Sequence, residues 1–329
     1  LLEKNPHLLI EGIVATCYAC QIETAYIYFR GEFQHASDLM DKAIEEAHKK
    51  GYLGKNIMGS GLDLDLYTHL GAGAYICGEE SALLNSLEGR RGEPRLKPPF
   101  PAVEGLYGKP TVINNVETLC AVPWIVNEGG EKYAAIGTEK SKGTKLVSVS
   151  GHVKKPGNYE IVLGMPVREI IFDLAGGIRN DNRLKAFIPG GSSVPMLTAD
   201  KVDVGYDYES LQEAGSMLGS GALIVMDHTV NVVEVTLRLA YFYMHESCGK
   251  CTPCREGTRW MWQILGKIQT GEGVGAQVDK LLDICDNMSF KCFCPLGDAA
   301  VGPVASSIKC FRSDYDELIK KLEGDKVAT

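Results

Sequence analysis

Three cysteines stand at intervals of three in the stretch ESCGKCTPCREG, and this spacing constrains the fold more than any other feature of the chain. Cys248, Cys251 and Cys254 fall where a loop leads into a helix-like pattern. A C-x2-C-x2-C run brings three thiolates to one corner, as one side of a [4Fe–4S] cube requires. A tetrahedral zinc site would usually take two cysteines from one knuckle and a second pair from elsewhere. The spacing therefore favours a [4Fe–4S] cluster. The alternatives are a structural zinc site and a buried group of free thiols.

The fourth ligand must come from a distant segment, and FKCFCPLGD offers two cysteines, Cys292 and Cys294. We expect Cys294, because a proline directly after a ligand cysteine recurs in iron–sulfur loops and Pro295 marks a break between helices. Cys292 is the alternative. Buried cysteine behaves as a small hydrophobe. We therefore predict core thiols at the remaining positions, which are Cys17, Cys20, Cys77, Cys120, Cys285 and Cys310.

Composition limits the classes of partner. Eleven cysteines without a secretory signal pattern indicate a reducing compartment, where spaced thiols bind metal or stay free more often than they form disulfides. The net charge is −8 and no basic run stands out, so we expect no nucleic-acid partner. No apolar run approaches the roughly 20 residues that cross a bilayer, and we expect no direct membrane insertion. The start, LLEKNPHLLIEG, lacks an initiating Met, and we expect further residues upstream.

The first third of the chain has the pattern of an α/β layer. Apolar spacing and residue type predict, in order, a helix over residues 8–25, a strand over 25–29, a helix over 37–51 and an alternating strand over 62–66. A strand, a helix and a strand in this order predict parallel pairing. We therefore expect an α/β domain with a parallel sheet over residues 1–136.

Two polar turns in this domain each lead into a helix. GAGAYICGEESALLNSLEG places glycines before a helix that should run from Glu79 to Gly89, where an α/β sheet binds ligands outside the carboxyl ends of its strands. VINNVETL offers Asn114 and Asn115 as caps of a second helix. Between them, RRGEPRLKPPFPA should be a rigid exposed loop, because its prolines remove donors and fix φ.

The composition changes near Gly137. Short strands over 143–151, 157–163 and 184–191, with a helix over 166–177, form a unit of the β-grasp type, which we place at residues 137–229. Helical periodicity then dominates to the end of the chain and predicts a helical bundle at 230–329. Its four helices are predicted at 230–246, 254–270, 276–288 and 298–322.

Four segments, taken in order, carry a family resemblance: GAGAYICGEESALLNSLEGRRGEPRLKPPFPA, NNVETL, IPGGSS and ESCGKCTPCREG. From Pro6 to about Leu322 the chain closely resembles the NADH-oxidising flavin subunit of respiratory complex I, a module that also occurs in NAD-linked hydrogenases and formate dehydrogenases. The resemblance implies a flavin domain, a β-grasp domain and a helical bundle with one [4Fe–4S] cluster. It also implies that NADH gives a hydride to FMN, which passes single electrons to the cluster.

The resemblance further implies the flavin-side residues. A glycine lets backbone approach the ring, and asparagine side chains can bond its polar edge. Glu80 is the candidate catalytic carboxylate. From the residues alone, the two glutamates are more plainly explained as an acidic helix start, which the helix dipole favours. The positions that match the family's flavin-facing turns are Tyr75, Gly78, Glu79, Glu80, Ile113, Asn114 and Asn115.

Two residues match nucleotide-side positions of the family. Lys97 can bind a pyrophosphate or a ribose. Phe100 lies among prolines and can stack on adenine. The alternative for Phe100 is a side chain that only fills space in the packing of the loop. Gly190 and Gly191 are predicted as a tight turn, with turn chemistry alone and contact with a cofactor as the two explanations. The family's glycine-rich FMN-phosphate loop has no match in residues 1–329, and GAGAYICG fails as a G-x-G-x-x-G fingerprint. We expect that loop upstream of Leu1.

The leading hypothesis is an NADH dehydrogenase (NADH:quinone oxidoreductase) component that admits electrons to complex I. A hydrogenase or formate dehydrogenase diaphorase subunit is the alternative, and a metal-stapled scaffolding module without redox activity is a distant one. The chain carries no added ferredoxin-type cysteine run, which favours complex I. The resemblance implies a thioredoxin-like [2Fe–2S] partner subunit and a larger iron–sulfur subunit. It implies a cytoplasmic location, or a peripheral one on the cytoplasmic or mitochondrial matrix face of a membrane complex.

Overall fold

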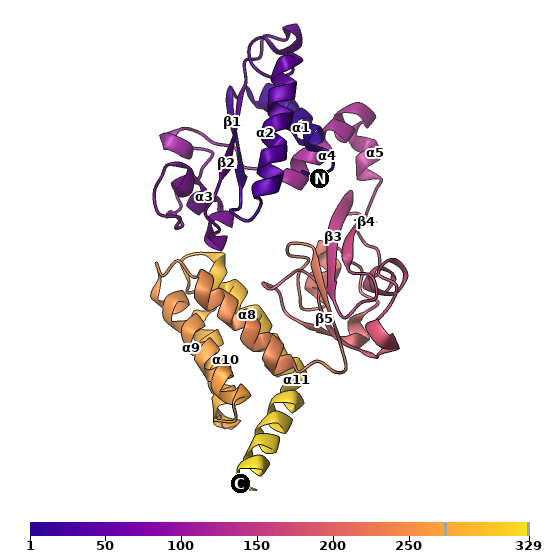
Figure 1. Cartoon of the computed structure of the whole chain (residues 1–329), viewed down its shortest axis with the longest axis vertical. Coiled ribbons are helices and arrows are strands. Elements are labelled where there is room, and N and C mark those ends of the chain that lie inside the picture. The colour runs from indigo at the N-terminus through magenta and orange to yellow at the C-terminus, as the bar shows by residue number, and fades with distance from the viewer. Residues whose placement is uncertain (273–274, 328–329) are drawn as a thin grey trace. The chain divides into compact units, whose positions relative to one another are not determined.

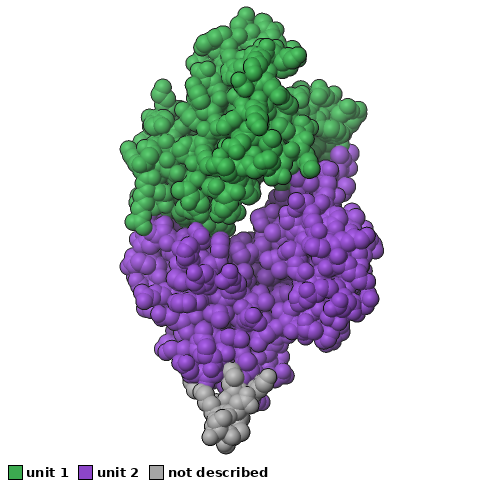
Figure 2. Space-filling model, viewed as in Figure 1, with its two compact units in different colours: residues 1–133 green, residues 134–329 purple. Residues whose placement is uncertain are grey.

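The computed structural model describes residues 1–272 and 275–327, with side chains to residue 320. The chain divides into two units, residues 1–133 and residues 134–329 (Figure 2). In the described residues, no helix is both long enough and apolar enough to cross a membrane.

A pair of parallel strands, β1 (Thr24–Phe29) and β2 (Asp65–Leu70), forms the sheet of the first unit. α2 (Gln34–Lys49) connects them, since parallel strands need a crossover. Apolar residues of both strands form one core with α2 and with α1 (Pro6–Cys20) (Figure 1). The predicted parallel α/β layer is confirmed.

The second strand lies later in the chain than the alternation over 62–66 predicts. Leu64 is buried, but it pairs with Gly54 in an isolated antiparallel bridge instead of joining β2. The first helix is also shorter than predicted, because Gln21 adopts a left-handed conformation (φ 58°) and ends α1.

The remaining helices of the first unit place the loops that follow the strands. They are α3 (Glu80–Leu87), α4 (Val116–Glu128) and α5 (Gly130–Ala134). Gly12 of α1 lies against α4, where an added Cβ would fall 2.0 Å from the carbonyl oxygen of Leu119. The backbone of RRGEPRLKPPFPA has no helix or strand, as its prolines predict.

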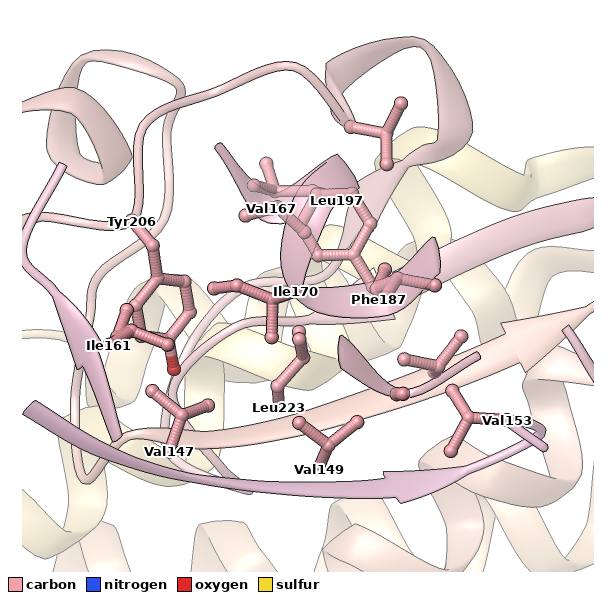
Figure 3. Close-up of a cluster of buried hydrophobic side chains, with 14 of the residues drawn as sticks. Val147, Val149, Val153, Ile161, Val167, Ile170, Phe187, Leu197, Tyr206 and Leu223 are labelled. Atoms are coloured by element: carbon pink, nitrogen blue, oxygen red, sulfur yellow. The ribbon is translucent and has the colours of Figure 1, made fainter. Parts of the chain in front are cut away.

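A five-stranded mixed sheet, in the order β4–β3–β7–β5–β6, opens the second unit. A buried apolar core lies on it, to which Val149, Ile170, Phe187 and Leu223 contribute (Figure 3). The predicted hairpin, helix and strand are present, although the helix continues after three residues as a π-helical turn at Ile170–Leu174. The elements are β3 (Thr144–Gly151), β4 (Gly157–Val162), α6 (Val167–Glu169), β5 (Leu184–Ile188), β6 (Leu197–Thr198), α7 (Tyr208–Glu213) and β7 (Ala222–Asp227).

The sequence pattern missed the central strand, β7. It pairs in parallel with β3 and antiparallel with β5. Its residues form a short apolar run without alternation, which periodicity does not distinguish from a buried helix segment. The Gly190–Gly191 turn follows β5 as predicted: Gly191 has φ +86°, and a Cβ on Gly190 would lie 2.5 Å from the carbonyl oxygen of Leu218. Turn geometry alone therefore accounts for both glycines.

Four helices complete the second unit, as predicted. α8 packs on α9 and α11, and α10 packs on α9 and α11. Their bounds are α8 (Val232–Glu246), α9 (Thr252–Gln269), α10 (Gly275–Met288) and α11 (Pro295–Val327). Of the thiols expected in the core, Cys17, Cys77, Cys120 and Cys285 are buried, whereas the expectation was wrong for Cys20 and Cys310, which are exposed.

We predict that Gly12→Ala destabilises the first unit by about 1–3 kcal/mol, because overpacking forces α1 and α4 apart. Gly130→Ala is the matched control, since its added Cβ would meet no atom within 4 Å. Urea unfolding of both variants, followed by the fluorescence of Trp124 in α4, measures the difference. Equal unfolding midpoints for Gly12→Ala and the control would contradict this account of the α1–α4 contact.

Candidate functional site

Glycines bring the loops after β1 and β2 together at the carboxyl end of the sheet. A Cβ on Gly31 would lie 2.6 Å from the backbone nitrogen of Gly73 and 2.8 Å from the carbonyl oxygen of Gly71. Tyr28 of β1 reaches across this edge, and its hydroxyl lies 2.9 Å from the Ser86 hydroxyl in α3. The sheet edge where α/β proteins bind ligands is therefore joined directly to the helix that follows it.

Glu79 caps α3. Its Oε2 accepts hydrogen bonds from the backbone N–H groups of Ser81 and Ala82, each at 3.0 Å, and from the Ser81 hydroxyl at 2.5 Å. A carboxylate at this position satisfies the unpaired N–H groups of the first turn and complements the helix dipole. The acidic helix start that the residues alone suggest is thus present, and one oxygen of Glu79 is fully engaged in it.

Lys97 lies between the two glutamates. Its Nζ donates to Glu79 Oε1 at 3.1 Å and to Glu80 Oε1 at 2.5 Å. The Glu80 side chain is 43% exposed, against 17% for Glu79 and 30% for Lys97. The structure therefore joins three predicted site residues, and Glu80 is the carboxylate that remains open to a ligand.

The charges of this group are coupled. Burial alone would raise the pKa of Glu79, but the hydrogen bonds from Ser81 and Ala82 and the Lys97 ammonium outweigh it and hold that pKa below its usual range. Burial would lower the pKa of Lys97, yet the two carboxylates outweigh it and raise that pKa. Both Glu79 and Lys97 therefore stay charged near neutral pH.

Arg95, which the sequence pattern did not single out, holds the loop that carries Lys97. Its backbone N–H donates to the Ser81 hydroxyl at 2.9 Å, and its Nε donates to Asn85 Oδ1 at 2.8 Å. It also lies 2.9 Å from the carboxylate of Glu88. These contacts place an irregular loop against α3. An arginine two residues before Lys97 was the available signal, but a surface arginine is too common for sequence alone to identify this role.

The other predicted flavin-side and nucleotide-side residues are accessible. Phe100 is 57% exposed and Tyr75 is 44% exposed, so neither is a packing plug. A Cβ on Gly78 would meet no atom within 4 Å, which leaves its backbone open to a flat ring. These open surfaces fit a flavin and a nucleotide.

A second turn holds the remaining predicted residues, Ile113, Asn114 and Asn115. Asn115 caps α4 by accepting from the backbone N–H of Glu117 at 2.8 Å, as the sequence predicts. Asn114 is exposed and Ile113 is half-buried. Asn114 and Asn115 are both exposed, and Asn115 uses its Oδ1 in the cap.

Three of the four predicted ligand cysteines lie at helix starts. Cys251 is the residue before α9, Cys254 lies in the first turn of α9, and Cys294 is the residue before α11. Helix N-termini carry a partial positive charge that stabilises anions. A thiolate at these positions would therefore be favoured by the helix starts beside it.

The four predicted ligand thiols lie near one another. Burial raises the pKa of the Cys254 thiol to about 11, and a hydrogen bond from Ser247 opposes the rise. The charges of its neighbouring thiols add to the rise, and these neighbours are Cys251, Cys294 and Cys248. A backbone N–H, that of Phe293, lies 3.4 Å from Cys251 Sγ. Four thiols and this donor suit a soft, anionic iron–sulfur group.

In the described residues, no group of three or more His, Cys, Asp or Glu side chains has the geometry to hold a single metal ion. A [4Fe–4S] cube takes one thiolate at each of four irons, so its ligands are arranged around a body.

Cys292, the alternative fourth ligand, is packed into a notch in the first turn of α11. A Cβ on Gly297 would lie only 2.2 Å from Cys292 Sγ, so the glycine makes room for this side chain. The Cys292 thiol also donates to the carbonyl oxygen of Met288 at 3.5 Å, at the end of α10. Burial raises the pKa of the Cys292 thiol to about 12, and the nearby Cys251 and Cys254 add to the rise. Cys292 also shares a hydrogen bond with Cys251, so it lies among the predicted ligand thiols.

Three family models match the chain in order. The model described as the Nuo51 FMN-binding domain matches residues 1–124, and an SLBB domain model matches residues 145–225. The model described as the NADH-ubiquinone oxidoreductase-F iron–sulfur binding region matches residues 234–318. The expected FMN and [4Fe–4S] cofactors are confirmed by the first and third models.

Curated relatives cover nearly the whole chain. The F subunit of NADH-quinone oxidoreductase from Streptomyces coelicolor is 55% identical over 319 residues, which are 97% of this chain and 71% of the relative. The protein of the same name from Rickettsia felis is 49% identical over 321 residues, 97% of this chain and 76% of the relative. The chain belongs to the family of NADH-quinone oxidoreductase F subunits.

A solved structure supports the fold of this family member. A crystal structure of NAD+-reducing [NiFe]-hydrogenase in the H2-reduced state matches with a TM-score of 0.87 and 34% identity. The match covers 97% of the present chain and 53% of the hydrogenase chain. The present chain therefore spans about half of that hydrogenase chain. The expected parallel-sheet domain, β-grasp unit and helical iron–sulfur region are confirmed.

We predict that Lys97→Met raises the pKa of Glu79 towards its usual value. The rise is partial, because the N–H groups of Ser81 and Ala82 still bond the carboxylate. A lowered folded-state pKa contributes stability above the usual pKa, and this contribution is lost as pH falls through the folded-state value. The variant therefore loses it at a higher pH than the parent protein.

Carboxyl NMR titration of labelled Glu79 measures this change. Lys55→Met is the matched control, since Lys55 pairs with Asp63 at 3.1 Å and not with Glu79. Identical Glu79 titrations in the two variants would contradict the coupling of Lys97 to the helix cap.

Proposed function

We propose that this chain oxidises NADH at the carboxyl edge of the β1–β2 sheet and passes the electrons to a [4Fe–4S] cluster in the α8–α11 helices. The observation that carries the proposal is the set of four thiols at the starts of α9 and α11, on the same chain as an FMN-binding domain. A flavin accepts the hydride of NADH and releases electrons singly, which a one-electron cluster requires.

The residues of the chain have separate proposed roles in this reaction. Glu80 is the catalytic carboxylate, because its side chain stays open to a bound ligand. Lys97 holds Glu80 and Glu79 in place and offers a positive charge to the dinucleotide. Tyr75, Gly78, Ile113 and Asn114 line the flavin side. Asn115 and Glu79 position this side through their helix caps.

Cys248, Cys251, Cys254 and Cys294 are the proposed cluster ligands. The position of Cys294 in the chain and the packing of Cys292 support Cys294 as the fourth ligand. Cys294 directly precedes α11, where the helix N-terminus favours a thiolate, whereas the Cys292 thiol is seated against Gly297 and donates to Met288.

We propose that the chain assembles within complex I, with a thioredoxin-like [2Fe–2S] subunit and a larger iron–sulfur subunit as partners, on the cytoplasmic or matrix face of the membrane. Identities of 49–55% to NADH-quinone oxidoreductase subunits support this parent complex. The structural match to NAD+-reducing hydrogenase keeps a diaphorase subunit as the second candidate. We also propose that the flavin domain ends at residue 136 and that the β-grasp domain ends at residue 229.

Phe100→Ala should raise the KM for NADH about tenfold, which corresponds to about 1.4 kcal/mol of lost stacking on adenine. The turnover number should change little, because the aromatic ring is proposed to contact only the nucleotide. NADH oxidation with an artificial one-electron acceptor measures both constants. Tyr18→Ala is the control, since Tyr18 is also exposed (60%) but lies on α1. A KM that is unchanged relative to this control would remove Phe100 from the nucleotide site.

Cys294→Ser should abolish the electron paramagnetic resonance (EPR) signal of the reduced cluster, whereas Cys292→Ser should keep it. Loss of a ligand leaves one iron of the cube without a thiolate, while loss of the Cys292 thiol removes its packing at Gly297 and its hydrogen bonds but no proposed ligand. EPR spectra and iron content of the anaerobically purified full-length variants measure the outcome. A retained signal in Cys294→Ser together with a lost signal in Cys292→Ser would transfer the fourth ligand to Cys292.

A further inference from the structure

Ser247 stands at the junction of α8 and the ligand loop, next to the first cluster cysteine. It ends α8, and its backbone N–H bonds the carbonyl oxygen of Tyr243 at 3.0 Å. Its hydroxyl oxygen lies 3.3 Å from Cys254 Sγ and also accepts a hydrogen bond from the Gly249 N–H at 3.3 Å. The hydrogen bonds to Tyr243 and from Gly249 therefore hold Ser247 in place beside the sulfur of Cys254.

The direction of the Ser247–Cys254 hydrogen bond follows from these partners. The Gly249 N–H occupies a lone pair of the hydroxyl oxygen, which leaves the hydroxyl proton for another acceptor. A ligand cysteine binds iron as a thiolate and has no proton to give. Ser247 is therefore the donor and Cys254 the acceptor whenever the cluster is bound.

Burial increases the effect of this bond. Cys254 is 5% exposed, and of the four proposed ligands it is the one that is buried. A hydrogen bond in a low-dielectric surrounding is electrostatically stronger than one in water. A second donor to a ligand sulfur, the backbone N–H of Phe293 on Cys251, is set by the chain path and not by a side chain. Ser247 is thus a donor that a single substitution removes.

We propose that Ser247 is a positioning residue that raises the reduction potential of the [4Fe–4S] cluster through its hydrogen bond to Cys254 Sγ. The inference rests on the proposed function, since it needs the cluster to be bound at these cysteines. Reduction adds one electron to the cluster, and no covalent bond forms or breaks. The added negative charge is shared with the ligand sulfurs, so an O–H donor stabilises the reduced form more than the oxidised form.

The test is a potentiometric titration of the whole enzyme, with the cluster followed by EPR. Ser247→Ala should shift the midpoint to a more negative potential. We expect the ratio of reduced to oxidised cluster at the parent midpoint to fall about threefold, or roughly 28 mV for a one-electron couple. Ser289→Ala is the matched control, because that hydroxyl donates to the carbonyl oxygen of Cys285 at 2.8 Å and not to a ligand sulfur. Its midpoint should equal that of the parent protein.

A second variant keeps the test decisive if Ser247→Ala fails to hold the cluster. Ser247→Cys retains a weaker donor of similar size, so its midpoint should lie between those of the parent and the alanine variant, or below the parent if only this variant assembles. An unchanged midpoint in either assembled Ser247 variant overturns the inference and leaves the proposed function intact. Absence of any cluster signal in the parent enzyme would instead overturn the proposed function.

Discussion

The grouping of four predicted ligand thiols beside the starts of α9 and α11 is the constraint that organises the α8–α11 region. α9 and α11 begin directly after Cys251 and Cys294, and the unpaired N–H groups of a helix start favour a negatively charged thiolate nearby. α10 links these helices, and Cys292 connects its last carbonyl to the first turn of α11. Ligand binding and helix packing therefore stabilise one another. The contact of Ser247 with Cys254 extends the same arrangement to α8.

The site in the first unit also contains a helix N-terminus, but there a side chain of the chain itself binds it. α3 also begins at the end of a loop that carries ligand-facing residues, but its N-terminus is already satisfied by Glu79. Lys97 then balances the charge of Glu79 and of the more exposed Glu80. A helix start that is neutralised internally leaves no strong anion site there. The N-terminus of α3 therefore suits contact with an uncharged ring, and the proposed charge contact with the dinucleotide falls to Lys97.

Much of this could be predicted from sequence, because the strongest signals are local. The spacing of Cys248, Cys251 and Cys254 and the proline after Cys294 identify the cluster segment, and Asn115 was correctly expected as a helix cap. The failures concern long-range context. β7 lacks alternation because it is the middle strand of the sheet, and the role of Arg95 depends on contacts with α3 that no local pattern encodes. The residues of GEE could suggest a helix start but not the position of Lys97 between the carboxylates.

The central claim is that one chain joins an NADH-reducible flavin to a [4Fe–4S] cluster at Cys248, Cys251, Cys254 and Cys294. The most direct measurement adds NADH anaerobically to the purified full-length enzyme and records its visible and EPR spectra, together with its iron and acid-labile sulfide content. The account predicts bleaching of the flavin, the EPR signal of a reduced cluster, and iron and sulfide in equal amounts. Bound zinc without labile sulfide, and no spectral response to NADH, would contradict it.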